Sequence, residues 1–218
     1  MSEVVLFLDA NVLAAPVTRT LVTAGAVADD LAIRWSAAAE AEADAHIPPR
    51  AWRVADVRRE KLGLALSPSA ASTTGLKTRS VKDRQIIADA IETEADFLIT
   101  VDVDDFSLDD LRAHRMSAVN PDYFMAHRFT KHAYREAVQV LVEASQNPRR
   151  TAEEIHTALG KRHPHLLQRF ADAFAAPPAG PDPDQPKLLF RGVICIQCEA
   201  DLTTDEQLRL GLCAEHLG

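Results

Sequence analysis

Two short apolar runs stand out in the pattern of hydrophobic and polar positions along the chain. Residues 4–8 read VVLFL and residues 97–101 read FLITV. A continuous run of this length is typical of a strand that is buried on both faces of a parallel sheet. A third short strand is predicted at 116–119. Helical spacing is found between the first two runs, over 12–30 with a break near Pro16, 36–46, 50–61 and 81–95. This alternation predicts an α/β fold with a mostly parallel sheet flanked by helices.

The chain is predicted to be helical after Pro121. Apolar residues recur at three- and four-residue steps within 122–145, and Thr151 with Glu154 predicts a capping box for a helix that ends near Gly160. Pro164 is expected to open a further helix. The proline-rich residues 177–186, PPAGPDPDQP, predict a linker. The predicted organisation is a domain over 1–126, a helical extension over 127–176, the linker, and a small C-terminal module over 187–218.

Composition narrows the classes of protein. The chain has 218 residues, 47% of them hydrophobic, and a net charge of -8, so bulk charge does not indicate nucleic-acid binding. It contains no run of 18 apolar residues, and MSEVVLFL does not resemble a secretory signal. The three cysteines argue against a closed disulfide framework. We therefore expect a cytoplasmic protein without a membrane partner.

Aspartates follow directly after two of the predicted strands. Asp9 ends the first strand and Asp102 ends the second, with Asp105 one short turn later. Ligands of open parallel sheets bind at the carboxyl ends of the strands, so these side chains converge if the two strands are neighbours. Carboxylates at such close spacing repel one another unless water or a cation separates them.

Two further acids are candidates for the same edge of the sheet. Glu40 lies in the first turn of a helix that Ser36 can cap, and Asp83 opens the helix before the second strand. Glu42 and Asp44 remain alternatives to Glu40, and Asp83 can also be explained as a capping-box partner of Ser80. Together these carboxylates favour Mg²⁺ or Mn²⁺, which can activate water and hold a phosphate oxygen.

Basic residues bracket the Asp83 helix start. We favour them for contacts with phosphate groups, although a solvated helix face also explains each one. They are Lys77, Arg79, Lys82 and Arg84.

The C-terminal residues CIQCEADLTTDEQLRLGLCAEH show metal-ligand spacing. Cys195 and Cys198 are separated by two residues, Cys213 and His216 likewise, and 14 residues separate the pairs. This spacing predicts a structural Zn²⁺ site with all four positions filled, which would stabilise a module too short to hold its own core. Three free thiols and a chance histidine are the alternative. Residues 176–218 contain three basic and seven acidic residues, which disfavours contact with nucleic acid.

An ordered set of fragments resembles the PIN-domain family over residues 3–126. LDANVL (8–13) resembles the opening of such a domain, WSAAAE (35–40) its second acidic helix, and VNPDYFM (119–125) its closing strand. KDRQIIADAIETEADFLITVDVDDF (82–106) resembles the remaining half, with small residues at Ala88 and Ala90. The C-terminal module resembles a zinc ribbon or treble-clef knuckle. Glu199 stands where these modules often have glycine, and the chain continues for about ninety residues beyond many toxin members of the family.

The resemblance implies a metal-dependent ribonuclease, a hydrolase of RNA, like the VapC toxins of toxin-antitoxin systems. It implies that Asp9, Glu40, Asp83 and Asp102 bind Mg²⁺ or Mn²⁺, that Asp105 assists, and that Asn11 and Thr100 position ligands or water. The implied partners are an RNA substrate and a small antitoxin protein, and whether the chain forms a homodimer is left open. Two alternatives remain, a non-toxin nuclease that acts on structured RNA or DNA and a non-catalytic, zinc-containing adaptor.

Overall fold

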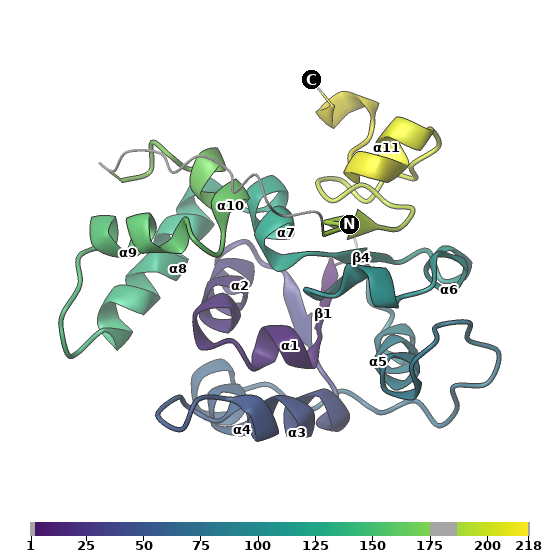
Figure 1. The fold of residues 1–218 in the computed structure, drawn as a ribbon, viewed down its shortest axis with the longest axis horizontal. Coiled ribbons are helices and arrows are strands. Elements are labelled where there is room, and N and C mark those ends of the chain that lie inside the picture. Colours follow the sequence, from purple (N-terminus) through teal and green to yellow (C-terminus); the bar gives the residue numbers. More distant parts are fainter. Residues whose placement is uncertain (1–2, 175–186, 218) are drawn as a thin grey trace.

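The sheet pairs β1 with a strand that follows it by about ninety residues in the sequence, and helices lie around the sheet (Figure 1). The computed structural model describes residues 3–174 and 187–217, so the linker predicted at 177–186 lies outside the described residues. The strands are β1 (Val5–Leu8), β2 (Ala32–Arg34), β3 (Phe97–Ile99), β4 (Ser117–Val119) and β5 (Phe190–Arg191). Their order is β2-β1-β3-β4-β5. The first four are parallel, and β5 is antiparallel to β4. The predicted α/β class and mostly parallel sheet are confirmed.

Helices cover the sheet and continue into the C-terminal half. They are α1 (Ala10–Leu13), α2 (Pro16–Ala28), α3 (Ala37–His46), α4 (Val54–Asp56), η1 (Val57–Leu62), α5 (Val81–Glu92), η2 (Val103–Asp105), α6 (Leu108–Ala113), α7 (Pro121–Arg128), α8 (Lys131–Ala144), α9 (Ala152–Leu159), α10 (Pro164–Arg169), α11 (Asp205–Leu210) and η3 (Ala214–His216). In the part of the chain that the structure describes, no helix is both long enough and apolar enough to cross a membrane.

Burial explains why the two apolar runs became neighbouring strands. In β1 the side chains of Leu6, Phe7 and Leu8 are fully buried, and so is every side chain of β3. Leu6 pairs with Phe97 and Leu8 with Ile99. A strand with both faces buried needs apolar residues at every position, which is the pattern that predicted it. The pairing also brings the ends of β1 and β3 to the same edge of the sheet.

The helix boundaries follow local capping and packing. Thr151 and Glu154 form the predicted capping box of α9, which ends at Leu159. The helix predicted over 122–145 is instead two helices, because α7 ends at Arg128 and the Thr130 side chain caps α8. Phe129 lies between them and packs against α2, where the ring would be 2.2 Å from a Cβ on Gly25. The short strand β2 was not predicted, because only three apolar residues lie between the polar residues Asp30 and Arg34.

The C-terminal module is joined to the sheet through β5. Ser117 in β4 accepts hydrogen bonds from the backbone N–H groups of Val193 and Ile194, and the Tyr123 hydroxyl donates to the carbonyl of Leu210. The Arg128 side chain reaches from α7 to the carbonyls of Ile196 and Gln197. The module therefore extends the sheet and packs on α7, so its strand shares the core of the first domain.

Candidate functional site

The carboxyl ends of β1 and β3 hold a network of hydrogen bonds around Asp9. Its Oδ2 accepts from the Thr100 hydroxyl at 2.7 Å and from Asn11 Nδ2 at 2.8 Å, and its Oδ1 accepts from the backbone N–H of Ala10 at 2.6 Å. Asp9 is also the N-cap of α1, and it is only 8% exposed. The Asp9 carboxylate, which the sequence places directly after a strand, is therefore buried and held in place by three hydrogen bonds.

Asn11 connects this carboxylate to Asp102. Its Nδ2 lies 3.2 Å from Asp102 Oδ2 and 3.0 Å from Thr100 Oγ1, in addition to the contact with Asp9. An amide nitrogen has two hydrogens, so three oxygens compete for them. Oxygens of two carboxylates and a hydroxyl are thus gathered around one positively polarised group. Hard divalent cations prefer the same kind of oxygen donors.

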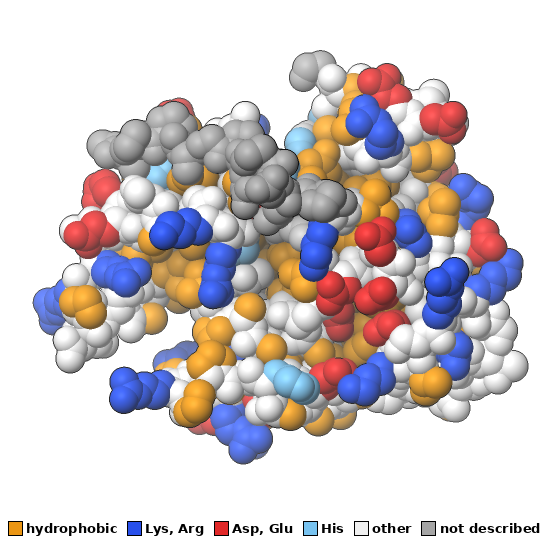
Figure 2. All heavy atoms as spheres, in the orientation of Figure 1, with side chains coloured by type: hydrophobic (Ala, Val, Ile, Leu, Met, Phe, Trp, Pro, Cys, Tyr) orange, Lys and Arg blue, Asp and Glu red, His pale blue; other side chains and the backbone are white. Residues whose placement is uncertain are grey.

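The surroundings of Asp9 disfavour its charged form. Burial raises the pKa of Asp9 to about 6, hydrogen bonds from Thr100 and Ala10 oppose the rise, and the negative charges of Asp83 and Glu42 add to it. The pKa of Asp105 is raised by burial and by Asp83, Asp102 and Asp104. These acids therefore act on one another, and the edge of the sheet bears a concentrated negative charge that a cation would relieve. Figure 2 shows acidic side chains gathered near the middle of the viewed face.

The three acids of α3 have different surroundings. Glu40 accepts from Trp35 Nε1 at 2.9 Å and from Arg58 Nε at 2.7 Å, so its carboxylate is already neutralised in a buried pair. Asp44 accepts from the backbone N–H of Val54 and from Arg53. Glu42 is the one whose charge raises the pKa of Asp9. Glu40 thus shares its charge with Arg58 and Asp44 is held by the Val54 N–H, whereas the charge of Glu42, an alternative that the sequence left open, acts on Asp9.

Three of the four predicted phosphate-binding cations have partners in the structure. Lys77 pairs with Asp109 at 2.8 Å, and Arg84 donates to the backbone carbonyls of Thr78 and Arg79. Lys82 pairs with Glu42 at 3.2 Å, which places it beside the acidic edge, meaning the carboxyl ends of β1 and β3 with Asp9, Asp83, Asp102 and Asp105. Lys187 is not among the predicted cations, yet its Nζ lies 3.6 Å from Asp102 Oδ1.

The acids are close to one another but not closed around a point. Metal ions in proteins are commonly bound by His, Cys, Asp and Glu side chains. Among residues 3–174 and 187–217, only one group of three or more of these side chains has its ligand atoms all within 4.8 Å of one another, and it is the Cys and His group of the C-terminal module. The oxygen chemistry of the acidic edge fits Mg²⁺ or Mn²⁺, which keep several waters as ligands and so do not require every carboxylate in direct contact.

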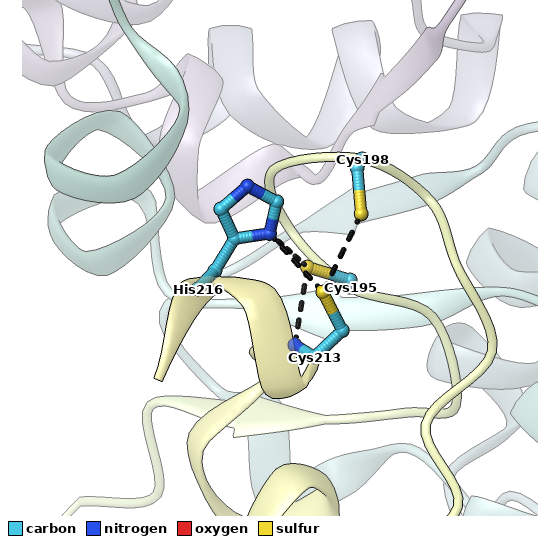
Figure 3. Close-up of side chains that lie close together, drawn as sticks. All are labelled: Cys195, Cys198, Cys213 and His216. Atoms are coloured by element: carbon cyan, nitrogen blue, oxygen red, sulfur yellow. Dashed lines mark hydrogen bonds between the residues drawn. The ribbon is translucent and has the colours of Figure 1, made fainter. Parts of the chain in front are cut away.

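Figure 3 shows that the four C-terminal side chains point toward one another. Cys198 Sγ lies 3.6 Å from Cys213 Sγ, and His216 Nδ1 lies 3.7 Å from Cys195 Sγ and 3.1 Å from Cys213 Sγ. A tetrahedron with Zn–S bonds of about 2.3 Å and Zn–N bonds of about 2.0 Å has edges of roughly 3.5 to 3.8 Å. This cluster can therefore hold a metal such as zinc, and two of the three separations already match.

Backbone groups prepare the same cluster for a cation. Burial raises the pKa of the Cys195 thiol, but the backbone N–H groups of Cys213, Gln197 and Cys198 donate toward its sulfur and bring the pKa down to about 7. Burial raises the pKa of Cys198, and the neighbouring thiols add to the rise. All three cysteines are free thiols. N–H groups directed at a sulfur stabilise the thiolate, which is the form that binds metal.

A separate apolar groove of about 990 Å³ lies between α2, the α4–η1 segment and α8. Four large hydrophobic side chains in its wall are unusually exposed. They are Val17 (37%), Val27 (58%), Trp52 (52%) and Val140 (42%). The groove is visible as a hollow with hydrophobic walls on the left side of Figure 2. None of the acids of the β1–β3 edge lines it.

Comparison of the chain with protein-family models, with curated proteins and with solved structures gave no match.

Proposed function

We propose that the chain is a metal-dependent endoribonuclease of the PIN-domain type, acting from the carboxyl ends of β1 and β3. The observation that carries this proposal is the meeting of Asp9 and Asp102 on the single amide of Asn11. Two residues far apart in the sequence deliver their carboxylates there because β1 and β3 are adjacent and parallel. The field of Asp83 and Glu42 on Asp9 adds support, since such a charge calls for a cation.

Roles follow from position. Asp9 and Asp102 are the principal ligands, and Asn11 and Thr100 hold Asp9 and orient the edge. Asp83 contributes charge from the first turn of α5, where Ser80 caps the helix through the Asp83 N–H, and Asp105 assists. Mg²⁺ or Mn²⁺ bound there would lower the pKa of a water and stabilise the charge that develops on a phosphate.

We propose Glu42 in place of Glu40 as the fourth acid. Glu40 has Arg58 and Trp35 as partners, and removing its carboxylate from Arg58 would leave a buried guanidinium unpaired. Glu42 only has to leave Lys82, a solvent-exposed partner. An exposed ion pair is worth up to about 1 kcal/mol, so a divalent cation can displace the lysine at little cost.

We propose Zn²⁺ as the occupant of the Cys195, Cys198, Cys213 and His216 cluster, with a structural role. Three sulfurs and one imidazole fill a tetrahedral shell, which leaves no position for substrate. The cluster therefore supports the fold of the C-terminal module and takes no part in cleavage.

Cleavage of a total RNA pool by the purified chain with Mn²⁺ or Mg²⁺ tests the nuclease proposal. We expect metal-dependent cuts that Asp9→Asn and Asp102→Asn abolish and that Asp109→Asn, a matched change at an exposed acid, leaves intact. Glu42→Gln should reduce cleavage and Glu40→Gln should not, provided both variants stay folded. Equal background in every variant, with folding and metal content verified, would refute the ribonuclease.

We further propose that the nuclease is a toxin whose partner is a small antitoxin protein. The exposed apolar groove supports a protein partner, because contiguous exposed hydrophobic surface commonly marks a binding site. Growth arrest on expression, relieved by the product of an adjoining small gene, would support the toxin. Cleavage without growth arrest would favour the housekeeping nuclease instead.

A further inference from the structure

The antiparallel strand β5 brings the C-terminal module to the acidic edge. Parallel strands β1, β3 and β4 end at this edge, and an antiparallel neighbour begins there. Phe190 pairs with Val119, and the Asn120 N–H donates to the carbonyl of Leu189 at 2.8 Å. The residues just before β5 therefore lie beyond the carboxyl end of β4, on the side where Asp9 and Asp102 are found.

Two cations of the module contact the acidic loop that follows β3. Lys187 Nζ lies 3.6 Å from Asp102 Oδ1, and Arg191 donates to the carbonyl of Phe106 at 2.8 Å and to that of Asp104 at 3.3 Å. Residues 187–218 are acidic as a whole, but two of their three basic residues, Lys187 and Arg191, lie beside this loop. Arg191 binds two backbone carbonyls and pairs with the Asp104 carboxylate at 3.4 Å, which fixes the loop. Lys187 keeps 64% of its side chain exposed, and its ion pair with Asp102 is a loose one, so the ammonium can turn to another partner.

Lys187 and Lys82 stand in equivalent relations to the proposed metal ligands. Lys82 pairs with Glu42 and Lys187 with Asp102, and both pairs are solvent-exposed. Each ammonium partly neutralises an acid that a divalent cation would neutralise more strongly. Once the acids have that partner, the lysines are left with unpaired charges beside the place where a phosphodiester must lie.

We propose that Lys187 is a substrate-positioning residue of the acidic edge, delivered by the metal-binding C-terminal module, and that it contacts a phosphate of the bound RNA when a divalent cation occupies the acids. This rests on the proposed ribonuclease function. The module then contributes to substrate binding through one side chain, and the Cys and His cluster acts on the edge by holding β5 against β4.

Steady-state kinetics on a short single-stranded RNA that the wild type cuts, with Mn²⁺, separate this role from others. Lys187→Ala should raise KM about three- to fivefold with kcat nearly unchanged, the effect of losing one exposed ion pair. The slope of log kcat/KM against log salt should become shallower by about 0.7, because one phosphate contact is lost. Lys187→Arg should restore both values. Lys131→Ala, which removes an exposed lysine of α8 that pairs with Asp172, should match the wild type.

Other outcomes overturn the proposal. Unchanged KM and salt slope in Lys187→Ala would show that Lys187 does not touch the substrate. A lower Mn²⁺ requirement with a higher kcat/KM would make it an inhibitory contact instead. If the wild type itself cuts no RNA, the ribonuclease proposal fails and the role of Lys187 fails with it, which is a different result from a cutting enzyme that is indifferent to Lys187.

A separate experiment tests whether the C-terminal cluster positions Lys187. Cys198→Ser should raise KM as Lys187→Ala does, and the double variant should be no worse than either. Additive effects would show that the cluster does not place Lys187. If circular dichroism shows that Cys198→Ser is unfolded, the comparison of Lys187→Ala with Lys187→Arg still decides the proposal.

Discussion

Asp9 is expected to lower the stability of the folded chain when no divalent cation is bound, and its replacement by asparagine should therefore stabilise the protein. The reason is that its pKa rises from 3.8 to about 6 on folding, chiefly through burial. The carboxylate opposes folding above pH 6, and this effect disappears as the pH falls from 6 toward 3.8, where the group is protonated in both states.

The size of the effect follows from the pKa. A shift from 3.8 to about 6 corresponds to roughly 3 kcal/mol at neutral pH. Asparagine keeps one oxygen but presents an NH₂ group to donors, so one or two of the three hydrogen bonds at Asp9 are lost, at about 1 kcal/mol each. The free energy of unfolding of Asp9→Asn should thus exceed that of the wild type by about 1 to 2 kcal/mol at pH 7.5, which corresponds to a melting temperature several degrees higher.

Urea unfolding of both proteins from pH 7.5 down to 4.5 provides the measurement. Mg²⁺ and Mn²⁺ are left out, and no chelator is added, so that the C-terminal cluster keeps its metal. The advantage of Asp9→Asn should shrink below pH 6, and added Mn²⁺ should stabilise the wild type alone. Asp102→Asn is the control, because that side chain is 47% exposed and should change stability little. A variant less stable than the wild type at every pH, or a difference independent of pH, would refute the argument.

Three further predictions concern the scaffold. The wild type should contain one zinc ion per chain and Cys198→Ser should contain none by elemental analysis, with a lower melting temperature, since three ligands bind zinc far more weakly than four; equal zinc content would contradict the site. Gly25→Ala should cost about 1 to 3 kcal/mol in urea unfolding because a Cβ would be 2.2 Å from the Phe129 ring, and Phe129→Leu should recover part of the loss. Arg58→Met should cost about 3 kcal/mol by leaving Glu40 buried without its cation, and adding Glu40→Gln should recover much of it, whereas additive losses would exclude the coupling.

Much of the fold could be predicted because its strongest signals are local. The runs at β1 and β3 are apolar at every position since both faces are buried. The capping box that begins α9 lies within four consecutive residues, from Thr151 to Glu154. β2 has only three residues, too few for a pattern to stand out. The break between α7 and α8 depends on Phe129 meeting Gly25, a contact between segments a hundred residues apart that no local pattern contains.

The acidic edge was predictable up to the point where helix phase decides. Asp9 directly follows β1 and Asp102 lies three residues beyond the end of β3, so the pairing of these two strands brings them together. Glu40, Glu42 and Asp44 lie on one short helix, and which of their charges acts on Asp9 depends on the partners of the other two, Arg58 and the Val54 N–H. Lys187 could not be foreseen, because its place follows from β5 pairing antiparallel to β4.

The short strand β5 has a consequence for the behaviour of the chain during synthesis. Without β5, the fully buried β4 would be the last strand of the sheet, with free backbone groups along its outer side. Such an uncovered apolar strand is a template for pairing with other chains. The Cys and His cluster is completed only when His216 has been made, so the growing chain exposes the outer side of β4 until then. With zinc as the proposed occupant of the cluster, zinc supply during expression should therefore govern how much of the protein escapes aggregation.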